Sequence, residues 1–244
     1  MPPMQNLNVP IYAGLVPPAP SECCVVSVGV GHWYPRGIAR MEESLSRFSP
    51  AVPRLLWSDS YPPGSPSHQE NNYVFKYHAL RLAAERYRYI LWLDAADWAV
   101  APIEPIFAFI AARKFLLPLD GWNCGQWTND ENLPVLGLTR EEAFGIPQLW
   151  TNHFGFDVYE PDAQKMLAEF GRYADLRAFH GPRTNHHGES SPDPRVLGHR
   201  HDQTVLSVIA HRMGLPTVPI DLSPVKFTAA GLKDPSALVY AQGM

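Results

Sequence analysis

The sequence predicts an α/β fold, a single domain with a mixed, mainly parallel central sheet flanked by helices. The 244 residues are 45% hydrophobic, which is enough for one sizeable core. Residues 23–30 form a nearly continuous apolar, largely β-branched run, typical of a strand buried on both faces. Strand-like and helix-like segments then alternate as far as residue 119, the order expected of a parallel sheet with right-handed crossovers.

Hydrophobic periodicity predicts the remaining elements of the first half. Helices are expected over residues 36–48, 73–87 and 103–112, and strands over 54–57, 89–93 and 114–119. The second of these helices is indicated by one stripe of side chains at helical spacing: Tyr73, Tyr77, Leu80, Ala84 and Tyr87.

The second half is less regular. Residues 120–134 read as a long loop with two tryptophans, and residues 179–199 as a loop rich in His, Pro and Gly. A strand is expected over 153–159, followed by a helix over 161–170 with Pro in its first turn. That helix should turn four side chains inward: Ala163, Met166, Leu167 and Phe170. A last helix over 202–213 should stop at Gly214.

The chain divides into a Pro-rich arm over residues 1–21 and one domain over 22–244. Within that domain we separate residues 22–119 from 120–244; the resemblance given below implies a nucleotide-binding half and an acceptor half, respectively. The net charge of −4 argues against a nucleic-acid partner. Three cysteines without paired spacing argue against a disulfide framework or a zinc ribbon. With neither a signal-peptide pattern nor an integral membrane segment, we expect a cytoplasmic protein.

Two carboxylates follow the apolar strand Tyr89-Ile-Leu-Trp-Leu, namely Asp94 and Asp97. Open α/β sheets bind ligands beyond the carboxyl ends of their strands. Hard oxygen ligands there suit Mg²⁺ or Mn²⁺ held against a substrate's phosphates. Asp97 also fits an ordinary turn or capping position.

A second motif, Gly29-Val-Gly-His-Trp-Tyr34, follows the first strand. It lacks the third glycine of the dinucleotide fingerprint, because Tyr34 stands at that place. One interpretation is a turn that contacts a nucleotide through Gly29 and Gly31, with Trp33 or Tyr34 available to stack on a base. The other is a tight strand-to-helix turn.

Three motifs in order resemble those of small nucleotide-sugar glycosyltransferases of the GT-A fold. They are Tyr73-Val-Phe-Lys-Tyr-His-Ala-Leu80, Tyr89-Ile-Leu-Trp-Leu-Asp-Ala-Ala-Asp97 and His201-Asp-Gln-Thr-Val-Leu206. The resemblance extends from about Val25 to Leu215. It implies a GT-A-like, Rossmann-like domain that transfers a sugar from a nucleotide-diphospho-sugar donor to a glycan or other hydroxyl acceptor.

The family's DxD motif implies a Mn²⁺ or Mg²⁺ ion bridging its carboxylates to the donor diphosphate. On this chain the resemblance assigns the metal to Asp94, Asp97 and His201. The pattern departs from the family here, because Ala96 stands where the second acid is usual and Asp97 comes one place later. The resemblance also places Lys76 near the donor phosphates, whereas most lysines lie on solvated helix faces.

On the acceptor side, the resemblance makes Asp202 the residue that orients or deprotonates the acceptor hydroxyl. The alternative is local, because Asp at a helix start caps free backbone amides. Trp122 and Asn123 in the long loop are candidates for an acceptor-binding lip, since sugar rings pack on aromatics and their hydroxyls need polar partners. A purely structural tryptophan anchor is the alternative.

Three rival functions use parts of the same pattern. A nucleotidyltransferase would share the acid-ended strand, although no Gly-rich, basic phosphate loop follows the first strand. A histidine-rich metallohydrolase would use His180, His186 and His187, although their spacing matches no zinc motif. A non-catalytic relative that binds sugar-nucleotides or glycans would account for Ala96.

Overall fold

A computed structural model describes residues 10–12, 14–227, 234 and 236–241. Its centre is a five-stranded sheet in the order β2-β1-β3-β8-β5. The strands are β1 (Cys23–Val28), β2 (Arg54–Trp57), β3 (Tyr89–Leu93), β5 (Phe115–Leu116) and β8 (His153–Asp157). β1 runs parallel to β2 and β3, whereas β8 runs antiparallel to β3 and β5. The predicted α/β fold with a mixed, mainly parallel sheet is confirmed.

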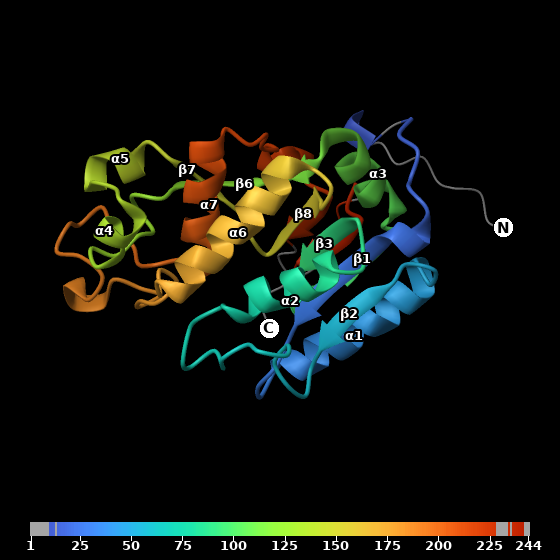
Figure 1. Ribbon diagram of the computed structural model, residues 1–244, viewed down its shortest axis with the longest axis horizontal. Helices are drawn as coiled ribbons and strands as arrows, with labels where there is room; N and C mark the ends of the chain where they lie inside the picture. Colours follow the sequence, from blue (N-terminus) through green and yellow to red (C-terminus); the bar gives the residue numbers. More distant parts are fainter. Residues whose placement is uncertain (1–9, 13, 228–233, 235, 242–244) are drawn as a thin grey trace.

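Helices cover both faces of this sheet (Figure 1). Because side chains alternate along a strand, Cys24 and Val26 of β1 join one core and Cys23 and Val25 the other. The first core also holds buried side chains of α2 (Phe75–Ala84), α6 (Pro161–Asp175) and α7 (His201–Met213). The second holds those of α1 (Tyr34–Phe48) and α3 (Glu104–Arg113).

The helix predicted over 73–87 is shorter in the structure, and the buried residues of α2 are Phe75, Lys76, Ala79, Leu80 and Ala83. In the predicted stripe Leu80 is buried, and the other four side chains are partly buried against the same core: Tyr73, Tyr77, Ala84 and Tyr87. The helix begins after Tyr73, which adopts a positive φ of 56°. The inward face of the helix includes a lysine because its ammonium pairs with the buried carboxylate of Asp202 and the partly buried carboxylate of Asp94, contacts that periodicity does not predict.

The prediction of one strand over 114–119 followed by a loop to residue 134 is also wrong. The chain forms β5 and then, past Pro118, a separate strand β6 (Leu119–Asn123). Proline lacks the amide hydrogen that a continued ladder needs. β6 pairs with β7 (Pro147–Leu149), and two short helices, α4 (Asn132–Leu136) and α5 (Arg140–Phe144), lie between them in sequence.

The other predicted helices and strands are present with small shifts at their ends. Of the four residues expected to face inward on α6, Ala163, Met166 and Phe170 are buried and Leu167 is partly buried. α7 ends as predicted, since Gly214 takes the left-handed conformation with φ 62°.

A three-stranded sheet joins β4 (Asp97–Ala99), β10 (Val239–Ala241) and β9 (Val225–Phe227). It places the end of the described chain beside the strand that follows Asp94. Short 3-10 helices complete the elements of the described residues: η1 (Pro10–Tyr12), η2 (Pro20–Glu22), η3 (His186–Gly188) and η4 (Ile220–Leu222).

The Pro-rich arm lies partly outside the described residues, namely at 1–9 and 13. Tyr12 of its described part is buried and packs on Phe109 of α3, with ring centroids 5.3 Å apart. No helix in the described part of the chain is long and apolar enough to cross a membrane.

Candidate active site

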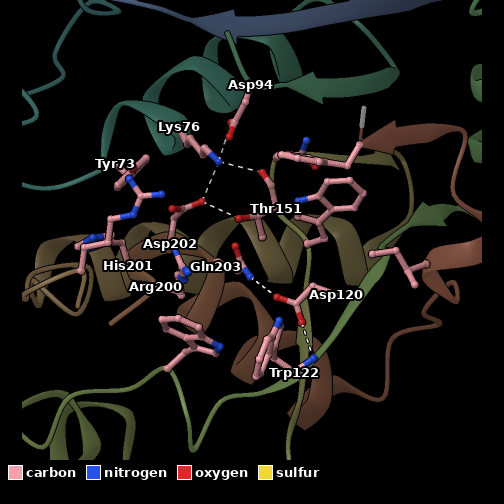
Figure 2. A pocket seen from close by; sticks show the side chains of 16 residues that line it. Tyr73, Lys76, Asp94, Asp120, Trp122, Thr151, Arg200, His201, Asp202 and Gln203 are labelled. Atoms are coloured by element: carbon pink, nitrogen blue, oxygen red, sulfur yellow. Dashed lines mark hydrogen bonds and ion pairs between the residues drawn. The ribbon is translucent and has the colours of Figure 1, made fainter. Parts of the chain in front are cut away.

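A cavity of about 560 Å³ opens beyond the carboxyl end of β3. Its lining comes from several segments that are far apart in sequence: the start of α2, the residue after β3, the strand β6 and the turn after it, the residues before β8, the loop with Arg183, the start of α7, and Ile220 and Phe227. Figure 2 shows Lys76 reaching from α2 toward Asp94 and Asp202 at the centre of this lining. The cavity therefore lies where open α/β sheets bind ligands.

Lys76 is the buried centre of the site. Its side chain is 2% exposed, and its ammonium lies 3.0 Å from Asp94 Oδ1 and 2.8 Å from Asp202 Oδ2. It also donates to the backbone carbonyl of Thr151 over 2.8 Å. An ammonium has three hydrogens, so every one of them has an acceptor. The two carboxylates hold the pKa of Lys76 above its usual value despite burial. The alternative of a solvated helix face is wrong.

Asp94 is held through one oxygen and free at the other. Oδ1 accepts from Lys76 and from the indole nitrogen of Trp92 at 2.7 Å. Its backbone amide donates to the carbonyl of Asn152, which fixes Asp94 beside the start of β8. Burial raises the pKa of Asp94, and Lys76 opposes that shift. Among the described residues, Oδ2 has no hydrogen-bond donor, so it is available to a ligand.

Asp202 is arranged in the same way from the opposite side. Its Oδ2 accepts from Lys76 and from the hydroxyl of Thr151 at 3.0 Å. The N-cap of α7 is Arg200, and that helix end has no side-chain capping bond. The capping alternative for Asp202 is therefore wrong, and its Oδ1 has no donor within the described chain.

Backbone strain marks the starts of both helices that supply this cluster. Tyr73 precedes α2 with φ 56°, and His201 opens α7 with φ 50°. Non-glycine residues adopt this region at a cost of roughly 1–3 kcal/mol, and they concentrate at functional sites. The two rings stack on each other with centroids 5.1 Å apart, and both line the cavity.

The predicted metal ligands do not converge. Asp97 is fully buried and absent from the cavity lining. Its Oδ2 accepts from the Asp94 amide at 3.1 Å and its Oδ1 from Asn152 Nδ2 at 3.3 Å, which is the turn role. Burial, and then the neighbouring Asp94 charge, raise the pKa of Asp97 well above its usual range. His201 does line the cavity, with Nδ1 bound to the Phe179 carbonyl at 2.8 Å.

In the described part of the chain, no three His, Cys, Asp or Glu side chains are grouped to hold a metal ion. Asp94 is the other predicted carboxylate ligand, and its Oδ1 is already paired with the ammonium of Lys76. These residues, as arranged, do not fit the expected Mn²⁺ or Mg²⁺. His180 bonds Asn72 through Nδ1 rather than joining a histidine cluster.

One carboxylate of the cavity, that of Asp120, was not predicted from the sequence. Asp120 lines it, accepting from the amide of Trp122 at 2.8 Å and from the side chain of Gln203 (Figure 2). Burial raises the pKa of Asp120 to about 6. Asp120 and Trp122 share one face of β6, whereas Asn123 points to the other and bonds Gln126. If a strand had been predicted over 119–123, the alternation of its side chains would have placed Asp120 on the same face as the predicted residue Trp122.

Aromatic side chains line the same cavity as Asp120. Trp122 is 49% exposed, and it meets Trp127 edge to face with centroids 5.9 Å apart. Trp150 lines the same cavity. Flat apolar faces beside a carboxylate suit a sugar ring with hydroxyl groups, which agrees with the predicted place of Trp122 but not of Asn123.

The glycine turn after β1 lies outside the cavity lining. Gly29 is buried, and a Cβ there would lie 2.5 Å from Ile38 and 2.9 Å from Ala95. Its lack of a side chain thus allows α1 to approach the turn that carries Asp94. Gly31 has φ 117°, and Trp33 is 58% exposed beside it. The structure does not bring these three predicted donor residues to Asp94's free oxygen.

No protein-family model and no curated protein matches this sequence. Among solved structures, the chain is similar to a glycosyltransferase involved in the glycosylation of the major capsid of PBCV-1. The two share 13% sequence identity and a TM-score of 0.48, over 90% of this chain and 91% of that one. The functional assignment therefore depends on the chemistry of the cavity.

Proposed function

We propose that the protein is a glycosyltransferase that moves a sugar from a nucleotide-diphospho-sugar to a hydroxyl acceptor, such as a glycan. The observation that carries the proposal is the pair of carboxylates bridged by Lys76. Each has one oxygen fixed and one free in a cavity that also offers tryptophan faces and arginines. Fixed carboxylates with a free oxygen are suited to bind hydroxyl groups in defined positions.

The donor sugar lies at the inner end in this proposal. Asp94 Oδ2 accepts a hydroxyl hydrogen of the donor's sugar or ribose, and its Oδ1 is kept from rotating by Trp92 and Lys76. The expected gain is positional, because the anomeric carbon is then held beside the acceptor.

The acceptor lies between Asp202 and the tryptophans. Asp202 Oδ1 takes the proton of the acceptor hydroxyl while the acceptor oxygen bonds to the anomeric carbon. The bond from that carbon to the diphosphate oxygen breaks, and its electron pair leaves with the diphosphate. This assignment describes an inverting reaction, in which one carboxylate base suffices.

Asp120 is expected to bind an acceptor hydroxyl rather than to move the proton. Its pKa of about 6 means that the carboxylate is ionised above that pH and becomes neutral below it. We predict that KM for the acceptor rises as the pH falls through about 6, and that Asp120→Asn removes this dependence. Steady-state kinetics at several pH values measure it. A pH step in kcat that vanishes in Asp120→Asn would instead make Asp120 the base.

A ligand panel tests the proposed function directly. We expect one class of nucleotide-sugar among UDP-, GDP-, ADP- and CMP-sugars to raise the melting temperature, because a ligand that binds the folded state stabilises it. Slow release of the free sugar from that donor should follow. Stabilisation by nucleoside triphosphates alone would favour a nucleotidyltransferase. Stabilisation by a nucleotide-sugar without any release or transfer would favour a non-catalytic binder.

A further inference from the structure

We propose that this site binds the donor's diphosphate without a divalent metal, with Lys76 as the built-in cation between the carboxylates and Arg183 and Arg200 as the phosphate ligands. The inference rests on the proposed function and specifies how the donor is held. It replaces the expected Mn²⁺ or Mg²⁺ with side chains of the chain itself.

The first step concerns the position of positive charge. In a metal-dependent site, a dication would draw the carboxylates together. Here the ammonium of Lys76 already does so, at 3.0 Å from Asp94 and 2.8 Å from Asp202, while 2% exposed. Adding a dication beside a buried ammonium brings like charges together, which is costly where water is excluded. Lys76 also has no hydrogen left for a phosphate, since all three already have acceptors.

The second step concerns two arginines that line the same cavity, Arg183 and Arg200. Within the described chain, neither guanidinium makes an ion pair or a side-chain hydrogen bond to a protein acceptor. Arg200 is instead held over the ring of Trp127, with its central carbon 3.9 Å from the ring centroid. Burial, and then the charge of Arg183, lower the pKa of Arg200. The two guanidinium groups therefore repel each other across the cavity.

The third step concerns what would relieve this repulsion. The cavity's formally charged lysine, arginine and aspartate side chains are three cations and three carboxylates: Lys76, Arg183, Arg200, Asp94, Asp120 and Asp202. Lys76 is committed to Asp94 and Asp202, which leaves two guanidinium groups facing one carboxylate, Asp120. Guanidinium forks match the oxygens of phosphate in geometry and charge. The diphosphate is anionic in the bound donor and gains charge as it departs, so the arginines would stabilise it further in the transition state.

Calorimetric titration tests the inference with UDP, GDP and ADP as probes, each in EDTA and each in Mn²⁺. We expect one of them to bind in EDTA with an affinity within a few-fold of that in Mn²⁺. We also expect that affinity to fall with added salt, because salt screens contacts between charges and Arg183 is exposed. Binding only in Mn²⁺ would overturn the metal-free inference and leave the proposed function standing. No binding in either buffer would overturn both.

Variants assign the phosphate contacts. Arg183→Ala should weaken nucleoside diphosphate binding about ten- to one-hundred-fold, the range for a lost hydrogen bond to a charged group. Arg113→Ala, at an exposed arginine ending α3, is the matched control and should leave the affinity unchanged. Arg200→Lys keeps the charge but loses the fork over Trp127, so an intermediate loss is expected. Equal affinities for the wild type, Arg183→Ala and Arg200→Lys would refute the assignment.

Discussion

Replacing Lys76 with Met is expected to lower the free energy of unfolding by about 3–5 kcal/mol, the usual cost of removing one partner from a buried ion pair. The variant leaves the facing carboxylates of Asp94 and Asp202 without their bridging cation. Urea denaturation at neutral pH measures the effect. The stability of the variant should rise relative to the wild type in acid. There, protonation of Asp94 removes its repulsion with Asp202, since burial raises the pKa of Asp94 and the missing ammonium no longer opposes that shift.

Two controls separate charge from packing. Lys165→Met removes a lysine with a 69% exposed side chain and should change stability by less than about 1 kcal/mol. The triple variant Lys76→Met, Asp94→Asn, Asp202→Asn keeps the shape and removes the buried charges, so it should regain much of the loss. A loss for Lys76→Met as small as that for Lys165→Met would show that the ammonium does not hold the site together.

Replacing Asp202 with Asn is expected to lower kcat about one hundred- to ten-thousand-fold, the contribution of a positioned general base. Asn keeps an oxygen for the Thr151 hydroxyl but cannot take a proton. Donor binding should change little, since Asp94 provides the donor contact in the proposed arrangement. Single-turnover transfer and donor titration together measure both quantities, once circular dichroism shows that the variant is folded at the assay temperature.

Asp162 provides the matched control for this prediction. It is the second residue of α6, as Asp202 is of α7, so both carboxylates favour the positive end of a helix dipole. Asp162 has a 47% exposed side chain, and among the described residues it pairs only with Lys165. Asp162→Asn should therefore leave kcat unchanged. An equal fall in kcat for the two variants, or none for Asp202→Asn, would contradict a catalytic role for Asp202.

The sequence predicted the parts of the fold that depend on local pattern. The apolar run ending at Asp94 became the central strand β3, and Pro161 and Gly214 marked a helix start and a helix end. The strand β6 was missed because its residues, Leu-Asp-Gly-Trp-Asn, lack an apolar period. Its partner β7 lies more than twenty residues away in the chain, and the pairing is therefore a tertiary property.

The candidate site divides in the same manner. Asp94, Lys76, Asp202, His201 and Trp122 were all named from the sequence, and all line one cavity. Asp97, Asn123, Gly29, Gly31 and Trp33 were named as well and do not line it. Spacing along the chain identifies which side chains could act but not their direction, because one residue's shift on a strand or turn reverses the face.

By itself, the sequence determined that an α/β sheet carries acids at the carboxyl end of a central strand, since apolar runs and helical periods act locally. Only the tertiary structure decided what surrounds those acids. Lys76, Thr151 and Asp202 are far apart in sequence, and packing α2 and α7 against the same end of the sheet brings them within 3.0 Å of one another. Because of these contacts Lys76 is the buried cation of the site, although lysines usually lie on solvated helix faces.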